Sequence, residues 1–280
     1  MKHQNAELEE VTDLSDERLE PFREIRNRNW TEKSGIFIAE GPILVEQLLA
    51  STFECQSLLL DRKHADRLNF DLGSIPQVFL LDNELVDQLV GFNFHRGCMA
   101  CGKRKTALTV QEFVGQSVPS KNSDLMVALV GIQDPENLGS ILRSCAAFGA
   151  QNVLLGPGTA DPFGRRALRV SMGTSFSLSF LRSNDFRNDV LHLAESGGYS
   201  VFATSLKPKS TELAAAIIEP GKNLLVFGNE RRGIPADILS VIENEIRIKM
   251  HLGTDSLNVG VAAGIILHHF SQKTLGADAE

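Results

Sequence analysis

The feature that most constrains the fold is a regular alternation of short apolar runs and helical patterns in the second half of the chain. Near-continuous apolar strands separated by helices are typical of a parallel sheet that is buried on both faces. We therefore predict an α/β domain over residues 124–275, closed by a long helix from 257 to about 270. The strand-like runs cover residues 125–132, 152–155, 177–181, 199–203, 223–227 and 245–250.

A smaller α/β domain is predicted to precede it, over residues 31–114. Pro42 is well placed to open a helix, and Asp82 to cap another. Short apolar runs at 57–60, 77–80 and 96–100 indicate strands. Residues 115–123 are rich in Gly, Pro and Ser and predict a linker, whereas the polar, acidic residues 1–30 predict a loose arm or a frayed helix.

Length and charge limit the class of protein. A chain of 280 residues can bury two cores, and its 42% apolar and 22% charged residues are ordinary for a globular protein. No apolar stretch is long enough to cross a membrane, and the first thirty residues lack the apolar core of a signal peptide, so we predict a cytoplasmic protein.

The net charge of −7 argues against broad nonspecific binding to nucleic acid, but it permits a local basic face. Each basic cluster taken alone is more typical of a solvated surface than of an RNA contact. Such clusters occur at residues 23, 26 and 28, at 103–105, at 165, 166 and 169, and at 231 and 232.

Cys98 and Cys101 have the spacing of half a zinc site or of a redox pair. No second cysteine pair follows, and no histidine pair lies downstream at a ligand spacing. We interpret the two cysteines as small apolar residues in or beside a strand, and we predict no metal.

Three loops that follow predicted strands carry polar residues. Ligands of parallel α/β sheets collect at the C-terminal ends of strands, where helix N-termini offer unpaired N–H groups. The first loop, at 131–140, contains Asn137 and Gly139, which also have simple interpretations as a cap and a turn. Arg143 lies off the apolar stripe of the next helix, about one turn in, as a solvated arginine would. The loop lacks the G-x-G-x-x-G pattern of a dinucleotide site.

The second loop lies within residues 224–235, where a buried strand ends at Gly228. A glycine there would let a ligand approach the backbone. Glu230 could orient a methyl donor or a basic partner, or it could simply pair with Arg231 or Arg232 on the surface.

The third loop lies within residues 248–264 and precedes the last helix. Ser256 or Asp255 is expected to be the N-cap of that helix. Capping does not explain Asn258, because we expect this poor helix former inside the first turn.

Together the three segments resemble the signature motifs of the SpoU (TrmH-like) RNA ribose methyltransferases, which belong to the knotted SPOUT superfamily. The matching residues are 137–143 with 148–150, 227–230 with Gly233, and 256–259 with 262–263. Residues 37–42 and 95–97 are similar to the opening and the close of the family's small N-terminal substrate-binding domain.

The resemblance implies a C-terminal parallel-sheet α/β domain with a trefoil knot, which is an exception to the unknotted rule. It also implies transfer of a methyl group from S-adenosylmethionine to a ribose 2'-hydroxyl of tRNA or rRNA, by a homodimer packed through the knotted domains. The donor-binding residues it implies are Thr204, Gly228, Ile248, Met250 and Leu257. The catalytic and RNA-positioning residues it implies are Asn137, Arg143, Glu230, Ser256 and Asn258.

Some points stay open at the level of sequence. Gly260 stands where many relatives have serine, and Arg231-Arg232 replaces a small residue followed by a base, which puts substrate choice in question. The family proposal makes Arg143 the base. A guanidinium is hard to deprotonate, so a phosphate clamp oriented by Glu230 is an equally physical role.

The sequence leaves other functions open beside ribose methylation. The alternatives are a catalytically silent RNA-binding module, methylation of a base, and a Rossmann-type oxidoreductase. The missing glycine fingerprint and the missing acidic ribose ligand disfavour the oxidoreductase.

Overall fold

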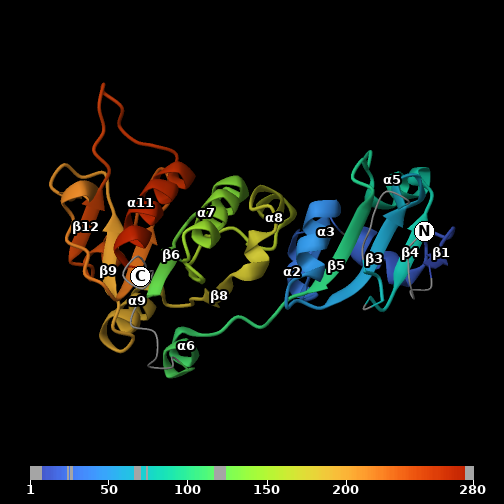
Figure 1. Ribbon diagram of the computed structural model, residues 1–280, viewed down its shortest axis with the longest axis horizontal. Coiled ribbons are helices and arrows are strands. Elements are labelled where there is room, and N and C mark those ends of the chain that lie inside the picture. The colour runs from blue at the N-terminus through green and yellow to red at the C-terminus, as the bar shows by residue number, and fades with distance from the viewer. Residues whose placement is uncertain are drawn as a thin grey trace. The chain divides into compact units, whose positions relative to one another are not determined.

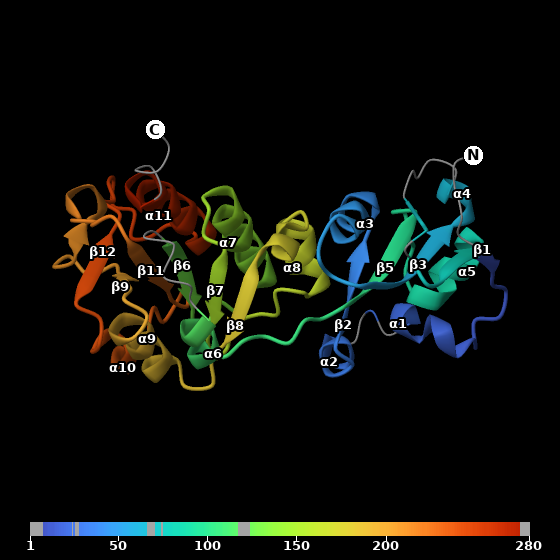
Figure 2. The ribbon, with the colours of Figure 1, turned by 60° about the horizontal axis from the view of Figure 1, so that its bottom comes forward.

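The computed structural model describes residues 8–23, 25, 28–65, 71–73, 75–116 and 124–274. The chain forms two compact units (Figures 1 and 2). Unit 1 comprises Met1–Thr106 and Phe163–Phe176, and unit 2 comprises Ala107–Pro162 and Ser177–Glu280. Unit 1 is therefore built from two stretches that are separated in the sequence by part of unit 2.

Unit 1 contains a five-stranded mixed sheet in the order β1-β4-β3-β5-β2. Strands β1, β4 and β3 are parallel, and β5 runs antiparallel to both β3 and β2. The strands are β1 (Leu8–Glu10), β2 (Ile36–Glu40), β3 (Cys55–Asp61), β4 (Val78–Leu81) and β5 (Cys98–Lys103). The helices are η1 (Glu17–Leu19), α1 (Glu20–Arg23), α2 (Arg28–Lys33), α3 (Pro42–Leu49), α4 (Arg62–Ala65), α5 (Asn83–Val90) and α8 (Arg165–Val170), with η2 (Thr174–Ser177) after α8.

The described N-terminal residues are part of unit 1, so the prediction of a loose arm is wrong for residues 8–23. Strand β1 pairs with β4, and the Leu19 and Phe22 side chains are fully buried. Both belong to a core cluster with Phe79 and Met99 on the sheet. This packing could not be predicted from the sequence, because the few apolar residues of the N-terminal segment are spread among acidic ones. Residues 1–7 of the predicted arm lie outside the described residues.

The segment Phe163–Phe176 packs two aromatic side chains against strand β2 of unit 1. The Phe163 ring stacks on Phe37 of β2 at 5.1 Å between centroids, and the Phe176 ring lies 5.3 Å from Phe37. Phe53 packs against both rings of the segment. At Gly102 an added Cβ would lie 2.2 Å from the Phe37 ring, so only glycine leaves room for it. Unit 1 thus depends on residues that the sequence assigned wholly to the second domain.

Unit 2 contains a seven-stranded sheet in the order β10-β12-β9-β11-β6-β7-β8, and every strand pair in it is parallel. This confirms the predicted parallel α/β domain. The strands are β6 (Asp124–Leu129), β7 (Asn152–Leu155), β8 (Ser179–Arg182), β9 (Ser200–Thr204), β10 (Thr211–Glu212), β11 (Lys222–Phe227) and β12 (Asn244–Arg247). The helices are α6 (Val110–Gln116), α7 (Pro135–Ala147), α9 (Phe186–Glu195), η3 (Leu213–Ala215), α10 (Ala236–Leu239) and α11 (Val259–Thr274).

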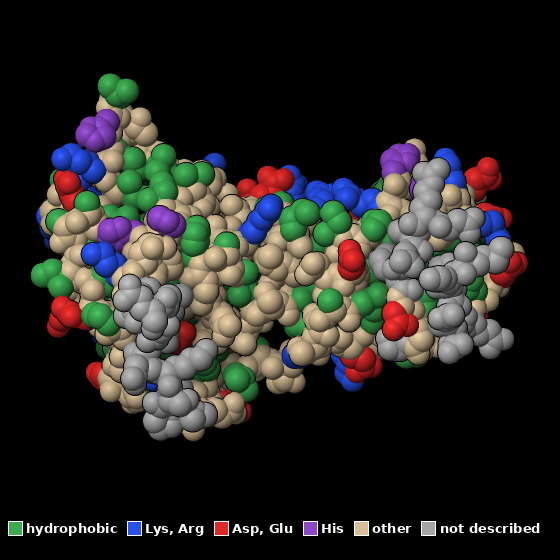
Figure 3. All heavy atoms as spheres, viewed as in Figure 1, with side chains coloured by type: hydrophobic (Ala, Val, Ile, Leu, Met, Phe, Trp, Pro, Cys, Tyr) green, Lys and Arg blue, Asp and Glu red, His purple; other side chains and the backbone are tan. Residues whose placement is uncertain are grey.

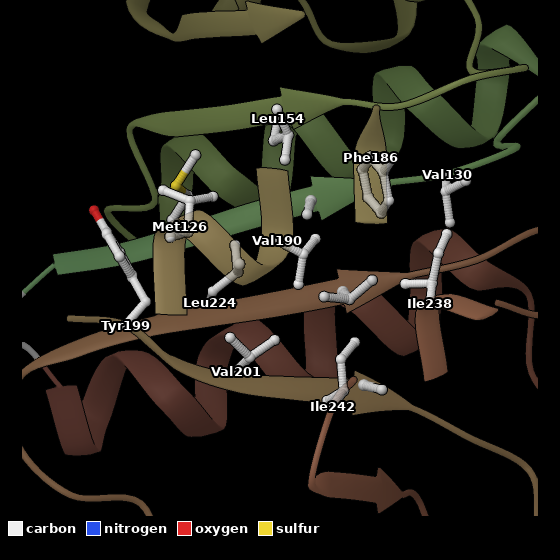
Figure 4. Close-up of a cluster of buried hydrophobic side chains, with 14 of the residues drawn as sticks. Met126, Val130, Leu154, Phe186, Val190, Tyr199, Val201, Leu224, Ile238 and Ile242 are labelled. Carbon is white, nitrogen blue, oxygen red and sulfur yellow. The ribbon is translucent and has the colours of Figure 1, made fainter. Parts of the chain in front are cut away.

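The central strands of unit 2 are buried on both faces, as their unbroken apolar runs predict. All residues from 125 to 129 in β6 are fully buried. On one face, Met126, Leu154, Val190 and Leu224 belong to a single hydrophobic cluster (Figure 4). The rigid central strands therefore provide fixed positions for the loops that follow them.

The boundary between the units differs from the predicted one. Helix α6 covers Gly115 and Gln116, the first two residues of the predicted linker, and the remaining linker residues lie outside the described ones. Val110 of α6 is buried in the unit 2 cluster, and the Gln111 Nε2 donates to Asp189 Oδ1 at 3.5 Å. The first unit therefore ends near residue 106 rather than 114, because the apolar face of α6 packs on unit 2.

Cys98 and Cys101 lie in β5 as buried residues, as the sequence predicts. Residues three apart on a strand point to opposite faces of the sheet, so these two thiols cannot approach one ligand together. Burial raises the pKa of both thiols to about 12, which keeps them protonated at neutral pH.

None of the helices in the described part of the chain combines the length and the apolar character needed to span a membrane. The trefoil knot implied by the resemblance stays a prediction.

Candidate active site

The candidate site lies in unit 2, at the edge of the sheet where β9, β11 and β12 end. These strands are parallel neighbours, so their C-terminal ends share one edge. A cavity of about 520 Å³ opens there, within the range of small-molecule sites. Apolar side chains such as Phe227, Ile246 and Ile266 line it beside charged ones. The cavity therefore combines an apolar wall with a few polar groups.

All five predicted donor-binding residues line this cavity: Thr204, Gly228, Ile248, Met250 and Leu257. Thr204 ends β9, and its Oγ1 donates to the Val226 carbonyl of β11 at 3.1 Å, which ties the two strand ends together. The structure thus places the five residues that the resemblance implies around one cavity, at the strand ends of one parallel sheet or in the loops that follow them.

Gly228 is required by the loop itself. An added Cβ would lie 2.4 Å from the Ile234 nitrogen and 2.5 Å from the Gly233 carbonyl carbon. The loop closes tightly because the Asn229 N–H donates to the Gly233 oxygen at 3.1 Å and the Gly233 N–H donates back at 2.8 Å. The sequence attributed this glycine to the approach of a ligand, but backbone packing already explains it.

Asn258 is the residue before the last helix, not a residue inside its first turn. Helix α11 begins at Val259, and the Asn258 Oδ1 accepts from the Gly260 N–H at 2.9 Å and the Val261 N–H at 3.3 Å. Asn258 therefore satisfies the helix N-terminus as a cap. The expectation that Ser256 or Asp255 would cap this helix is wrong, because the helix starts later than predicted.

A chain of hydrogen bonds runs from this cap to Glu230. The Asn258 Nδ2 donates to Asn137 Oδ1 at 2.8 Å, and the Asn137 Nδ2 donates to Glu230 Oε1 at 2.7 Å. The cap fixes the direction of the chain: since Oδ1 of Asn258 faces the helix, its Nδ2 must face Asn137. Asn137 then presents its own N–H to the carboxylate. One residue from each of the three motifs thus joins a single network.

Asn137 lies within helix α7 rather than before it. The helix begins at Pro135 and is capped by Asp134, whose Oδ1 accepts from the Glu136 N–H at 2.9 Å. Arg143 is consequently more than two turns into the helix, and about 9 Å further along its axis than Asn137. The sequence placed Arg143 only one turn in.

Arg143 and Ser256 stand apart from the network. Arg143 is exposed and is not among the residues that line the cavity. Ser256 lines the cavity from an exposed position in the loop before α11. Glu230 is held by Asn137, so the structure gives no support to the expectation that Glu230 orients Arg143.

Asn229 is a positioning residue that the sequence analysis did not single out. Its Oδ1 accepts from the N–H groups of Arg231 and Arg232, both at 3.0 Å, and its Nδ2 donates to the Gly131 carbonyl at 2.8 Å. It therefore shapes the second loop and ties it to the first. Its position between Gly228 and Glu230 in the second motif is the sequence feature that could have identified it.

Gly260 has a local explanation. An added Cβ would lie 2.8 Å from Ser140 Oγ and 3.0 Å from Ser140 Cβ, so α11 and α7 approach closely at this point. Gly260, which departs from the family pattern, thus leaves room for the Ser140 side chain on the facing helix.

The loop between β12 and α11 projects from unit 2. Figure 3 shows apolar and histidine side chains at its tip. Leu252 is fully exposed there with a φ of 56°, a backbone conformation that is uncommon for a residue other than glycine. Ser256 and Leu257 belong to the same loop, so this side of the cavity is formed by exposed chain.

Comparison with known proteins agrees with this geometry. Residues 124–268 match the SpoU rRNA Methylase family. An uncharacterized tRNA/rRNA methyltransferase of Mycobacterium bovis is 30% identical over 94% of this chain and 91% of its own length. The 23S rRNA (guanosine(2553)-2'-O)-methyltransferase of Bacillus subtilis is 24% identical over 94% of this chain and 99% of its own length.

A solved structure has the same fold. The AdoMet-bound rRNA methyltransferase from Sinorhizobium meliloti superposes with a TM-score of 0.80 and 23% identity, covering 95% of this chain and 97% of that protein. The family match covers the whole described sheet of unit 2, including the three loops that meet at the cavity and its network. The chain belongs to the SpoU rRNA methylase family.

Proposed function

We propose that this protein transfers a methyl group from S-adenosylmethionine to a ribose 2'-hydroxyl of tRNA or rRNA, in the cytoplasm. The observation that carries the proposal is the cavity at the strand ends, whose five predicted donor-binding residues adjoin the network that ends at Glu230. The names of the relatives from Mycobacterium bovis and Bacillus subtilis support the same substrate class.

The residues of the cavity fit this donor chemically. Ile248, Met250 and Leu257 offer apolar surface to an adenine ring, and the turns at the strand ends offer backbone groups. Glu230 lines the same cavity and supplies a negative charge for a positively charged donor. When bound, S-adenosylmethionine supplies an electrophilic methyl group on a sulfonium. The protein itself contributes position and charge.

Asn137 and Asn258 act by positioning Glu230. Their fixed hydrogen bonds remove the freedom of an otherwise exposed carboxylate, so its charge stays at one place beside the cavity. The reaction requires the ribose hydroxyl to lose a proton during attack. The Glu230 carboxylate can accept a hydrogen bond from that hydroxyl and then take its proton as the new C–O bond forms and the bond from sulfur to the methyl group breaks.

Arg143 is proposed to act as a phosphate clamp for the RNA rather than as the base. Its guanidinium is exposed, and such a group stays charged at neutral pH. We expect Arg143→Ala to abolish turnover and to leave donor binding nearly unchanged. Calorimetry with S-adenosylmethionine tests this, and a loss of donor affinity as the main defect would contradict it.

A homodimer packed through unit 2 is proposed as the working form. Val261 and Ile265 are exposed apolar residues four positions apart on α11, so they form one stripe on its surface. Helix α11 packs on α7 through the close contact of Gly260 with Ser140, and Arg143 lies on α7. A second copy of the chain would cover this stripe and bring Arg143 to the interface.

Incubation with labelled donor and RNA tests the reaction. We expect label in tRNA or rRNA, and nuclease digestion followed by nucleoside mass spectrometry should show a 2'-O-methylated nucleoside. A methylated base would support the alternative acceptor, and donor binding without any transfer to RNA would support a silent binding module. A modification map of RNA from cells that lack the protein would identify the nucleotide.

A further inference from the structure

We propose that Arg231 and Arg232, in the loop after β11, bind the phosphodiester on the 3' side of the nucleotide that accepts the methyl group. They would thereby hold the 2'-hydroxyl of that nucleotide at the cavity. This phosphate site rests on the proposed function, because its ligand is the acceptor RNA. It also gives a role to the two positions at which the second loop departs from the family pattern.

The cationic side chains that line the cavity fall into two pairs. Lys207 and Arg247 each form an ion pair with a glutamate, at 3.1 Å and 2.8 Å between nitrogen and oxygen. Arg231 and Arg232 line the same cavity, and neither guanidinium has a carboxylate of the described residues within ion-pair distance. The cavity therefore carries two cations whose charge is left for a ligand.

The backbone of the loop fixes the points from which these two side chains project. The Asn229 Oδ1 accepts from the N–H groups of Arg231 and Arg232, both at 3.0 Å. Asn229 and Gly233 exchange two backbone hydrogen bonds that close the loop, and both arginine side chains are exposed at its tip. A backbone that is already ordered loses less entropy when its side chains bind. The loop is thus prepared for a contact with a ligand.

The charge of the two arginines selects the kind of ligand. The sulfonium of the donor is positive, so the guanidiniums repel it, whereas Glu230 in the same cavity attracts it. Arg231 and Arg232 therefore suit an anion. The planar fork of N–H donors in arginine matches the oxygens of a phosphate in pairs. The acceptor RNA brings one such anion with every nucleotide.

The phosphodiester on the 3' side is the one nearest to the reacting group. On a ribose, the 2'-hydroxyl and the 3'-oxygen that carries this phosphate are attached to neighbouring carbon atoms. A phosphate held by the loop therefore brings the hydroxyl to the cavity, beside Glu230. The guanidiniums also lower the cost of the negative charge that develops on the hydroxyl oxygen as its proton leaves.

Arg143 does not occupy this position within one chain. It is exposed on α7 and is not among the residues that line the cavity, whereas Arg231 and Arg232 adjoin Glu230. The clamp proposed for Arg143 therefore concerns a different phosphate. The site also implies a class of acceptor: the modified nucleotide lies inside an RNA chain, because a 3'-terminal nucleotide has no phosphodiester on its 3' side.

Two double variants test the site. Arg231→Ala/Arg232→Ala removes both guanidiniums, and Arg231→Lys/Arg232→Lys keeps the charge without the fork. Both leave the hydrogen bonds of Asn229 in place, because these bind backbone N–H groups. The control Arg187→Ala/Lys209→Ala removes two exposed cations of unit 2 that do not line the cavity.

The probe is total RNA from cells that lack the protein. Its binding is measured by filter retention over a range of salt concentrations, and its methylation is measured as kcat and KM with labelled donor. Calorimetry measures the affinity for S-adenosylmethionine and for 5'-methylthioadenosine, which lacks the methionine carboxylate. Melting temperatures are recorded for all variants.

We expect the alanine variant to raise KM for RNA and to lower kcat, each by about tenfold, because the contact both binds and positions the acceptor. The slope of log K against log salt should fall by about 0.7 for each lost phosphate contact. The lysine variant should keep the slope and recover only part of kcat. The affinity for both small molecules should stay at the wild-type value, and the control should behave as the wild type.

Several results would overturn the phosphate site. One is an alanine variant whose kcat, KM and salt slope equal those of the control. Another is a lower affinity for S-adenosylmethionine with an unchanged affinity for 5'-methylthioadenosine, because the arginines would then bind the carboxylate of the donor. Label in a 3'-terminal nucleotide, or a wild-type protein that binds no RNA, would also overturn it. RNA binding that depends on Arg231 and Arg232 without methyl transfer would instead contradict the proposed function.

Discussion

At the scale of single residues, the best-defined part of the site is an amide whose orientation is imposed by a helix. Asn258 caps α11 with its oxygen, so its nitrogen is committed to Asn137, and the nitrogen of Asn137 is committed to Glu230. A side chain with a structural task thus fixes a carboxylate that is distant in the sequence. Asn258 uses its oxygen for the helix and its nitrogen for the network. Substitutions that remove one group or both can therefore separate an effect on stability from an effect on activity.

Two substitutions of Asn258 separate these effects. Asn258→Asp keeps an acceptor for the helix N-terminus, so the free energy of unfolding should change by less than about 0.5 kcal/mol. It removes the donor to Asn137 and releases Glu230, so kcat should fall by about ten- to a hundredfold, the equivalent of one hydrogen bond to a charged group. Thermal melting and single-turnover kinetics measure the two quantities.

Asn258→Ala serves as the matched comparison. It removes the cap as well, so it should destabilise the protein by about 1 kcal/mol while lowering kcat to a similar extent. Equal kcat values for Asn258→Asp and the wild type would show that the network does not serve the reaction.

At the scale of elements, the loop after β11 is shaped by its own backbone. Gly228 lies so close to Gly233 and Ile234 that any side chain must displace the loop. We expect Gly228→Ala to weaken donor binding by at least about tenfold and to destabilise unit 2 by about 1–3 kcal/mol. Calorimetry and denaturant unfolding measure the two effects. Gly115→Ala is a suitable control: this glycine of α6 is also in unit 2 and has no positive φ, and an added Cβ there meets open space.

The elements of unit 2 could be predicted from the sequence because central strands of a parallel sheet are unbroken apolar runs. Strand β7 has the predicted bounds, and β11 differs by one residue. The short edge strand β10 was missed because two residues carry no periodicity. Helix starts were less predictable, because more than one residue in each loop can cap a helix. Asp134 and Asn258 cap α7 and α11, whereas Asp255 and Ser256 offered the same capping chemistry before α11.

The candidate site was predictable to the extent that it follows strand ends. The five residues predicted to bind the donor lie at strand ends of one sheet or in the loops that follow them, and they line one cavity. The link between Asn137, Glu230 and Asn258 depends on side-chain orientation, which spacing does not encode. The role of Asn229 was missed for the same reason, because its partner Gly131 belongs to a different loop.

At the scale of the whole molecule, unit 1 needs a segment that lies within the family-matched part of the chain. Phe163→Ala removes a buried ring between Phe37 and Phe53 and should destabilise unit 1 by about 3–5 kcal/mol. Hydrogen exchange of β2 amides should quicken more than that of β9 amides. Phe186→Ala, a buried ring of unit 2, should have the reverse pattern. The same exchange pattern for both variants would contradict the division.

The proposed dimer is tested by a charge on the α11 stripe. Ile265 is 42% exposed, and Ile265→Asp should convert the dimer to monomers because a carboxylate cannot be buried there without a partner. Sedimentation equilibrium measures the mass. Ile217→Asp places the same charge at a position that is 80% exposed outside α11 and should leave the mass unchanged. A wild-type monomer would refute the dimer.

The divided make-up of unit 1 has a consequence for how the protein is made. Chains are synthesised from the N-terminus at about 5–20 residues per second, so residues 107–176 take on the order of ten seconds to add. Until Phe163 and Phe176 emerge, the rings of Phe37 and Phe53 lack the partners that cover them. During that interval the nascent chain exposes an aromatic surface, which makes the ribosome-bound protein a natural client for chaperones.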